Sequence, residues 1–265
     1  MKKMSTEKLY KIFVYVALIS LAISIIVPVA WVFVSSLKTN AEFQGSPWTL
    51  PMSFYFQNFI DAFEKAHMAE YLLNSVIVTA LGLILLVIIA LPASYVLARF
   101  DFAGKKIINT LFMAGLFINV NYIVVPIFLM LLDWDDVIYN LFGQTFFLDN
   151  IFVLAVVYAS TALPFTIYLL SGYFKTLPKA YEEAAFIDGC GYFKTLIKVM
   201  APMAKPSIIT VILFNFLAFW NEYIIALTLM PGASKTLPVG LVTLSKGQMA
   251  AANYGQLYAG LVIVM

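Results

Sequence analysis

Long runs without a charged residue are the feature that most constrains the fold of this chain. Runs at 12–37, 71–98, 107–132 and 151–174 contain no Asp, Glu, Lys or Arg, and a fifth at 206–230 contains only Glu222. A helix needs about 20 apolar residues to cross the hydrocarbon core of a bilayer. Backbone groups in lipid must be satisfied within the protein, which a helix achieves along its own length. The runs therefore predict five membrane-spanning helices.

Composition excludes several classes of protein. Apolar residues make up 63% of the 265 residues and charged residues 11%, whereas soluble domains average about 45–50% and about 25%. This balance excludes a soluble enzyme, a nucleic-acid-binding domain and a disordered chain. With one cysteine, Cys190, and one histidine, His67, the sequence predicts no internal disulfide, no metal site and no catalytic site.

The last apolar stretch, about 256–265, is long enough for only half a bilayer at 1.5 Å per residue. A half-span that ended in lipid would leave carbonyl groups unsatisfied. We expect that the natural chain continues and completes a sixth helix; the alternative is a re-entrant half-helix. The expected fold is all-α, with six transmembrane helices.

Basic residues are distributed unevenly between the two sides of these helices. Of the 16 lysines and arginines, twelve lie before the first run or in the segments after the second and fourth runs. Basic residues are enriched on the cytoplasmic side of membrane proteins. The N-terminus and these segments are therefore predicted to be cytoplasmic.

The cytoplasmic segment 175–205 is longer than a simple connection between helices needs. Pro178 can begin a helix, and Glu182 and Glu183 fall in its first turns, where the helix dipole favours carboxylates. Gly189 and Gly191 then permit a turn with positive φ. The sequence predicts a short helix at the membrane surface.

The small side chains of Ala184 and Ala185 would let the backbone of another protein approach this helix closely, and the carboxylates could pair with its basic groups. On composition alone, a docking site and a connector that lies on the lipid headgroups are equally supported.

A spacing motif carries a resemblance to a known family. The residues Glu-Ala-Ala at 183–185 are followed after three residues by Gly189, and nine residues later by four residues that end at Pro202. This resembles the signature of membrane subunits of binding-protein-dependent ABC importers, which is Glu-Ala-Ala, three residues, Gly, nine residues and Ile-x-Leu-Pro. Val199 replaces Ile conservatively, whereas Ala201 in place of Leu departs from the pattern.

A second resemblance narrows the family. The stretch FLAFWNEYIIALTLM at 216–230 and the segment 236–265 resemble the smaller of the two dissimilar membrane subunits of maltose/oligosaccharide-type permeases. The resemblance extends from about Ser35 to Met265. It implies a type I ABC importer permease fold with a cytoplasmic coupling helix, in the cytoplasmic membrane of a bacterium or archaeon.

The resemblance also implies a division into parts. Residues 1–38 would form the N-terminal tail and first transmembrane helix, and residues 39–70 an outer loop with an interfacial helix. Residues 71–265 would form the core permease domain with helices two to six, the coupling loop 175–205 and an outer loop 231–255.

The implied mechanism places the chemistry outside this chain. Two ATPase subunits would bind ATP and Mg²⁺, a second and larger homologous permease would complete the path, and an extracytoplasmic binding protein would deliver the sugar. The chain itself would carry no cofactor and would contact membrane lipid but no nucleic acid. By position in the motif, the residues implied in ATPase coupling are Glu182, Glu183, Ala184, Ala185, Asp188, Gly189 and Pro202.

Polar residues inside the predicted spans are candidates for the substrate path. Glu222 is the only ionisable group within a run, and a carboxylate in lipid costs at least about 2.5 kcal/mol. With Trp220 and Asn221 it offers an aromatic face and planar hydrogen-bonding groups, which suit a sugar. We favour a path-lining position over an interface between the permease subunits. The further candidates are Asn119, Asn121 and Thr161.

The leading hypothesis is therefore a permease that imports an oligosaccharide. A polyol or glycerol-phosphate permease of the same family is the alternative, although the runs contain no Lys or Arg to bind a phosphate. A secondary transporter is disfavoured because it would need inverted repeats and several intramembrane charges.

Overall fold

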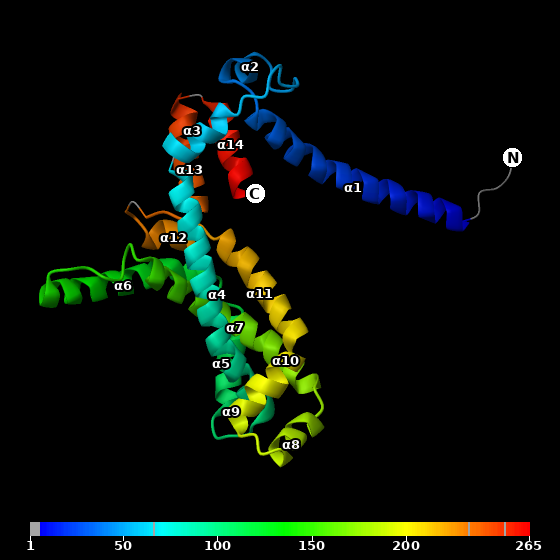
Figure 1. The fold of residues 1–265 in the computed structure, drawn as a ribbon, viewed down its shortest axis with the longest axis vertical. Helices are drawn as coiled ribbons and strands as arrows, with labels where there is room; N and C mark the ends of the chain where they lie inside the picture. Colours follow the sequence, from blue (N-terminus) through cyan, green and yellow to red (C-terminus); the bar gives the residue numbers. More distant parts are fainter. Residues whose placement is uncertain (1–5, 66, 233, 252) are drawn as a thin grey trace. The chain divides into compact units, whose positions relative to one another are not determined.

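The computed structural model describes residues 6–65, 67–232, 234–251 and 253–265, and their regular elements are all helical (Figure 1). The N-terminal helices are α1 (Thr6–Ser36), α2 (Asn40–Gly45) and α3 (Gln57–Lys65). Next come α4 (Met68–Arg99), α5 (Lys105–Gly115), α6 (Val120–Phe142) and α7 (Ile151–Thr176). The following elements are α8 (Ala180–Ile187), α9 (Tyr192–Thr195), the π-helix η1 (Leu196–Met200), α10 (Ala201–Met203) and α11 (Lys205–Trp220). The last are α12 (Ile224–Leu229), α13 (Leu237–Ala251) and α14 (Tyr254–Val264).

Among the described residues, three helices, α1, α4 and α7, are long and apolar enough to cross a membrane on their own. Two bent pairs raise the number to five if each pair is one span: α5 with α6, and the helical segment Tyr192–Met203 with α11. Helix α14 is apolar but shorter. An all-helical membrane protein is thus confirmed, whereas the number of six spans remains a prediction.

The third predicted span, 107–132, is wrong as a single straight helix. It is divided between α5 and α6, whose axes meet at 105°. Asn119 begins α6, because its side-chain oxygen accepts a hydrogen bond from the backbone N–H of Asn121 at 2.9 Å. An Asn side chain at this position competes with helix continuation and favours a new start.

Contacts divide the chain into two compact units, one of Met1–Ala69 with Gly240–Met265 and one of Glu70–Val239. In the second unit, α7 lies beside α5 and α11 (Figure 1). Gly82 of α4 lets this helix approach the others, since a Cβ there would lie 3.2 Å from the ring of Phe219. The core combines α4, α7 and α11, with fully buried Leu86, Tyr95, Leu154, Tyr158, Leu170, Phe174 and Val211.

In the first unit, α14 packs against α1 and α3. The buried Lys38 donates from Nζ to the carbonyl oxygen of Pro47 at 2.7 Å, which folds the chain back beside the end of α1. The side chain of Asn58 in α3 donates to the carbonyl oxygens of Ser36 and Lys38, both at 2.8 Å. These hydrogen bonds join α3 to the chain that leaves α1.

The segment expected as an outer loop, 231–255, is mostly the helix α13. Pro238 stands in its first turn, where proline's missing N–H costs nothing. Just before α13, the carbonyl of Lys235 accepts a hydrogen bond from the side chain of Asn74 in α4 at 3.1 Å, and the N–H of Leu237, the first residue of α13, donates to the hydroxyl oxygen of Ser75 at 2.7 Å. The glycine and serine residues of this segment favour a loop, but the apolar residues between these glycines and serines are sufficient for a helix.

Gly255→Ala tests the packing of α14 against α3. A Cβ at this position would lie 2.6 Å from Nδ2 of Asn58 and 2.8 Å from the carbonyl oxygen of Lys38. We expect a loss of about 1–3 kcal/mol, the usual cost of overpacking, measured as a lower thermal midpoint of the purified protein. Gly172→Ala is the control, because open space surrounds it. Equal midpoints for both variants would contradict this packing.

Candidate functional site

The segment 175–205 lies at one end of the second unit, at the opposite end of α11 from α12 (Figure 1). It folds as α8, α9, η1 and α10 before α11 begins. The predicted short helix is α8, with Glu182 and Glu183 in its first turn. The coupling candidates therefore share one helix and the turn after it, except for Pro202, which is exposed in α10.

The C-terminus of α8 is closed by a left-handed residue. Gly189 has φ +74°, its N–H donates to the carbonyl of Phe186 at 3.0 Å, and the N–H of Cys190 donates to the carbonyl of Ala185 at 2.9 Å. This pair of bonds is a Schellman motif, in which glycine avoids the strain that a Cβ would cause. Gly191 has φ −75° and is extended, so the expectation of positive φ is wrong for it.

Helix α8 presents different sides to the protein and to solvent. Glu182 and Ala185 are buried against the unit, whereas Glu183, Ala184 and Asp188 are exposed. Ile187 is 87% exposed. The predicted face of small residues is therefore divided, with one alanine in the packing and one on the surface.

Arg99, the last residue of α4, holds α8 through an ion pair with the buried carboxylate of Glu182. Its Nε lies 3.2 Å from Oε1 of Glu182, with side chains only 6% and 12% exposed. Its terminal nitrogen also donates to the carbonyl of Leu177, the C-cap residue of α7, at 2.7 Å. Removing one partner of a buried ion pair costs about 3–5 kcal/mol, because the other charge is left uncompensated.

A surface ion pair nearby offers a contrast. Lys105 donates to Asp101 at 2.9 Å, and the Asp101 side chain is 97% exposed. This hydrogen bond lowers the pKa of the Asp101 carboxyl. Solvent screens such a pair, so it contributes little to stability.

Aromatic rings form a second connection between the long helices and α8. Phe174 of α7 packs edge-on against Tyr95 of α4, and Tyr95 against Phe100, with centroids 5.5 Å apart in both pairs. Phe100 packs on Tyr192 of α9 at 5.4 Å, and Tyr192 on Phe186 of α8 at 5.2 Å. We call these five residues the aromatic series. Edge-to-face pairs are favourable beyond the area that they bury.

Glu222 lies at a break in the fifth predicted span, between α11 and α12. Its two carboxylate oxygens accept hydrogen bonds from the N–H groups of Ile225 at 2.8 Å and Ala226 at 3.1 Å, at the start of α12. The hydroxyl of Tyr158 in α7 donates to the same carboxylate at 3.0 Å. The side chain therefore satisfies the orphan donors of a helix N-terminus and connects α12 to α7.

The other path candidates do not converge on Glu222. Asn221 is exposed and donates to the carbonyl of Leu217 at 2.8 Å. Trp220 is half-buried and stacks on Phe216 with centroids 5.7 Å apart. Asn119 and Asn121 are exposed at the start of α6.

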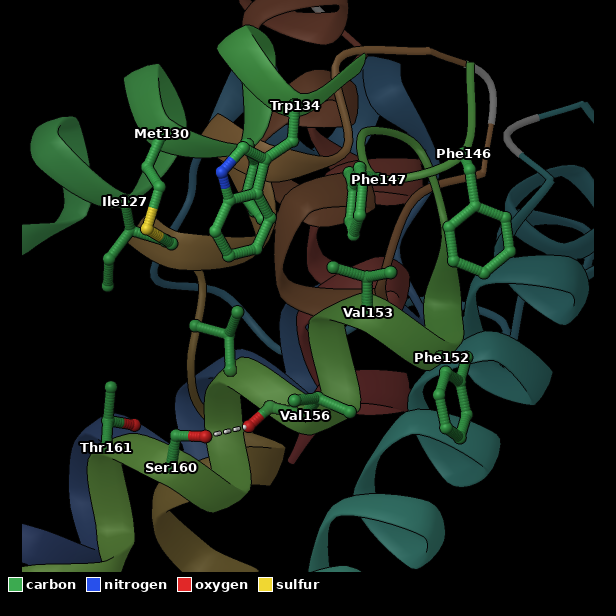
Figure 2. A pocket seen from close by; sticks show the side chains of 12 residues that line it. Ile127, Met130, Trp134, Phe146, Phe147, Phe152, Val153, Val156, Ser160 and Thr161 are labelled. Atoms are coloured by element: carbon green, nitrogen blue, oxygen red, sulfur yellow. Dashed lines mark hydrogen bonds between the residues drawn. The ribbon is translucent and has the colours of Figure 1, made fainter. Parts of the chain in front are cut away.

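Thr161 lines a pocket of about 370 Å³ between α6 and α7 (Figure 2). The rings of Trp134 and Phe147 meet at its upper edge, with centroids 5.2 Å apart. The hydroxyl of Thr161 donates to the carbonyl of Tyr158 at 3.0 Å, and that of Ser160 to the carbonyl of Val156 at 2.7 Å. Since the remaining lining residues are apolar, this pocket does not offer the planar polar groups that a sugar needs.

Sequence reasoning missed Arg99, Tyr158 and Asp135 as site-forming residues. Asp135 in α6 is 2% exposed, and its carboxylate accepts three hydrogen bonds from the backbone N–H groups of Phe146, Phe147 and Leu148. Arg99 is one of the twelve basic residues that predict the cytoplasmic side. A charged residue at the end of an apolar run carries no sequence signal that distinguishes a buried partner from a solvated one.

Comparisons with known proteins agree on one family. The family model described as a binding-protein-dependent transport system inner membrane component matches residues 90–265. The diacetylchitobiose uptake system permease protein NgcG of Streptomyces coelicolor is 35% identical over 263 residues, covering 98% of this chain and 83% of that protein. The trehalose/maltose transport system permease protein MalG of Thermococcus litoralis is 29% identical over 266 residues, covering 98% and 90%.

A solved structure shares the fold. It is a bacterial ABC transporter involved in the import of the acidic polysaccharide alginate, and one of its chains matches with a TM-score of 0.80. The match covers 100% of this chain and 94% of that chain at 23% sequence identity. The likeness extends over the whole length of the chain.

The contact between Tyr158 and Glu222 can be tested by a double-mutant cycle. We expect Glu222→Gln and Tyr158→Phe each to cost about 1.5–3 kcal/mol, the value of hydrogen bonds to a charged group, and their combination to cost less than the sum. The measurement is the thermal midpoint of the purified complex. Ser160→Ala, whose hydroxyl bonds only within α7, is the control. Strictly additive losses would show that the two side chains act separately.

Proposed function

The chain belongs to the family of binding-protein-dependent transport system inner membrane components, and we propose that it forms, with a second and larger permease, the path of an ATP-driven importer for an oligosaccharide. Members of this family are permease subunits of ABC transporters and not enzymes, as the sequence predicted. The ABC importer permease fold is likewise confirmed. The protein is a component of a cell membrane.

Two observations support an oligosaccharide as the substrate. Relatives that match nearly the whole chain are named for the uptake of diacetylchitobiose and of trehalose or maltose, which are disaccharides. The apolar runs carry no Lys or Arg that would neutralise a phosphate. A polyol or glycerol-phosphate substrate is therefore less well supported.

The proposed partners are two ATPase subunits, which bind ATP and Mg²⁺, a larger permease and an extracytoplasmic sugar-binding protein. Family membership implies each of these kinds of partner, and their number is our proposal. The distribution of basic residues supports a cytoplasmic N-terminus in the membrane of a bacterium or archaeon. In this orientation, α8 lies on the cytoplasmic side with the ATPases.

The observation that carries the proposal is the exposed side of α8. Its Glu-Ala-Ala sequence has the spacing of the family, and Glu183, Ala184 and Asp188 are exposed at the end of the second unit. We propose that Glu183 and Asp188 pair with basic groups of an ATPase while Ala184 allows close approach. On the other side of α8, Glu182 and Ala185 hold the helix against the unit. Gly189 ends the helix, and Pro202 lies where the chain returns to the membrane.

Such docking can drive transport only if it discriminates between states of the ATPase. A helix that bound the open and closed ATPase equally well would shift neither population. Closure of the ATPase pair must therefore bring the two docked helices of the permeases together and reorient the path. A firmly held α8 meets this requirement, because a loose loop would absorb the displacement.

For the path itself, we propose a role for the exposed Asn221, Asn119 and Asn121 and for the half-buried Trp220 and Thr161. Glu222 is half-buried and accepts three hydrogen bonds within the chain. Its contribution to the path is therefore to fix the break between α11 and α12, beside which Trp220 and Asn221 lie.

Glu183→Lys tests the docking role. The substitution should leave the complex inserted in the membrane but reduce sugar-stimulated ATP hydrolysis about tenfold or more, since like charges across an interface cost several kcal/mol. ATP hydrolysis is measured in proteoliposomes with the loaded binding protein. Asp136→Lys makes the same charge reversal at an exposed residue of α6 and should retain stimulation. Normal transport by Glu183→Lys would refute the assignment.

The substrate class is tested by stimulation of the reconstituted complex. Its binding protein is loaded in turn with disaccharides, longer oligosaccharides, a polyol and glycerol phosphate, and ATP hydrolysis is recorded for each. We expect stimulation by oligosaccharides and little by the small solutes. Strongest stimulation by glycerol phosphate or the polyol would replace the oligosaccharide assignment with the alternative.

A further inference from the structure

Arg99 occupies a position where one side chain reaches three helices. It is the last residue of α4, its guanidinium donates to the C-cap carbonyl of α7 at Leu177, and its Nε contacts the carboxylate of Glu182 in α8. Its hydrogen bond goes to Leu177, whereas its contact with Glu182 is an ion pair at 3.2 Å whose N–H is not aligned for a hydrogen bond. The ends of two membrane helices and α8 are thus joined through a single charged group.

The site is shielded from solvent. The side chains of Arg99 and Glu182 are 6% and 12% exposed. Water screens exposed ion pairs and weakens them, whereas buried pairs are much less screened. A buried pair also fixes orientation, because each partner must face the other or remain uncompensated. Glu182 can satisfy this only while α8 keeps its present rotation, which leaves Glu183 on the exposed side.

The aromatic series runs between the same elements. It leads from Phe174 in α7 and Tyr95 in α4 through Phe100 and Tyr192 to Phe186 in α8. Phe174 and Tyr95 are buried in the core, whereas Phe186 and Tyr192 are exposed, so the series connects the core to the surface side of α8. The ion pair therefore resists rotation and separation of α8, and the ring contacts add a second attachment of α8 to α4 and α7.

We infer that Arg99 is a positioning residue that makes α8 move as one body with α4 and α7, so that displacement of α8 reaches the membrane helices. The inference rests on the proposed function for its consequence in transport, but not for the contact itself. Without the ion pair, α8 would still dock, and ATP hydrolysis would continue, while less of the movement would reach the path. Loss of Arg99 should thus uncouple hydrolysis from uptake.

The first arm of the test reads the mobility of α8 directly. Cys190 is the only cysteine of the chain and follows Gly189 at the end of α8. A spin label is attached there in the full complex, with cysteines of the partner subunits replaced. Arg99→Gln and Glu182→Gln should each increase label mobility, and Arg99→Lys should do so less. Lys105→Gln removes the cation of the exposed pair with Asp101 and should change nothing.

The second arm measures sugar imported per ATP hydrolysed in proteoliposomes. We expect this ratio to fall about fivefold or more in Arg99→Gln and Glu182→Gln, the lower end of common coupling effects, and to stay normal in Lys105→Gln. The variant with both substitutions should lose less than the two single losses combined, since neither charge is then left alone. Arg99→Lys and this double variant carry the test if a single variant fails to assemble.

The outcomes separate the inference from the proposed function. Unchanged label mobility in Arg99→Gln and Glu182→Gln would overturn the positioning role whatever the substrate. Increased mobility with a normal ratio of sugar to ATP would overturn transmission through this contact. If the unmodified complex showed no sugar-stimulated hydrolysis, the proposed function would fail, while the mobility of α8 would still decide whether Arg99 holds it.

Discussion

In a bilayer, every backbone N–H and C=O group must find a partner within the protein, because lipid offers none. The long helices meet this requirement along their length, but two of the predicted spans are interrupted. At each interruption a side chain replaces the missing backbone partner. Asn119 accepts the N–H of Asn121 where α6 begins, and Glu222 accepts those of Ile225 and Ala226 where α12 begins. The starts of α6 and α12 therefore each depend on a polar side chain.

The same constraint changes how polar residues in the spans are interpreted. A carboxylate at membrane depth suggests a contact with substrate, yet the described contacts of Glu222 are with this chain, including the hydroxyl of Tyr158. Asp135 likewise binds the backbone of the loop after α6. These hydrogen bonds lower the free-energy cost of burying the two carboxylates, because each accepts from several donors. A polar side chain within a predicted span therefore indicates a break in a helix as readily as it indicates a transport path.

In α8, at the end of α11 that lies away from α12, the neighbouring carboxylates of Glu182 and Glu183 have different surroundings. Successive residues of a helix are rotated by about 100°, so Glu182 can face Arg99 while Glu183 faces outward. Anchoring and the proposed docking thus use adjacent residues without competing for the same contact. In this proposal, the inward side of α8 supplies the rigidity that coupling requires, and the outward side recognises the partner.

The sequence by itself determined that the chain is helical and lies in a membrane, because long apolar runs have few other stable solutions, and its motif spacing identified the family and the position of α8. It also located the left-handed turn at Gly189, since the spacing of the motif places a glycine where the helix ends. Only the structure showed the 105° bend between α5 and α6 and the helix in 231–255, although both involve local residues that a pattern of apolar runs does not resolve. Tertiary structure alone decided the contacts of Arg99 with Glu182 and of Tyr158 with Glu222, because these residues lie far apart in the chain and a local pattern holds no record of a distant partner.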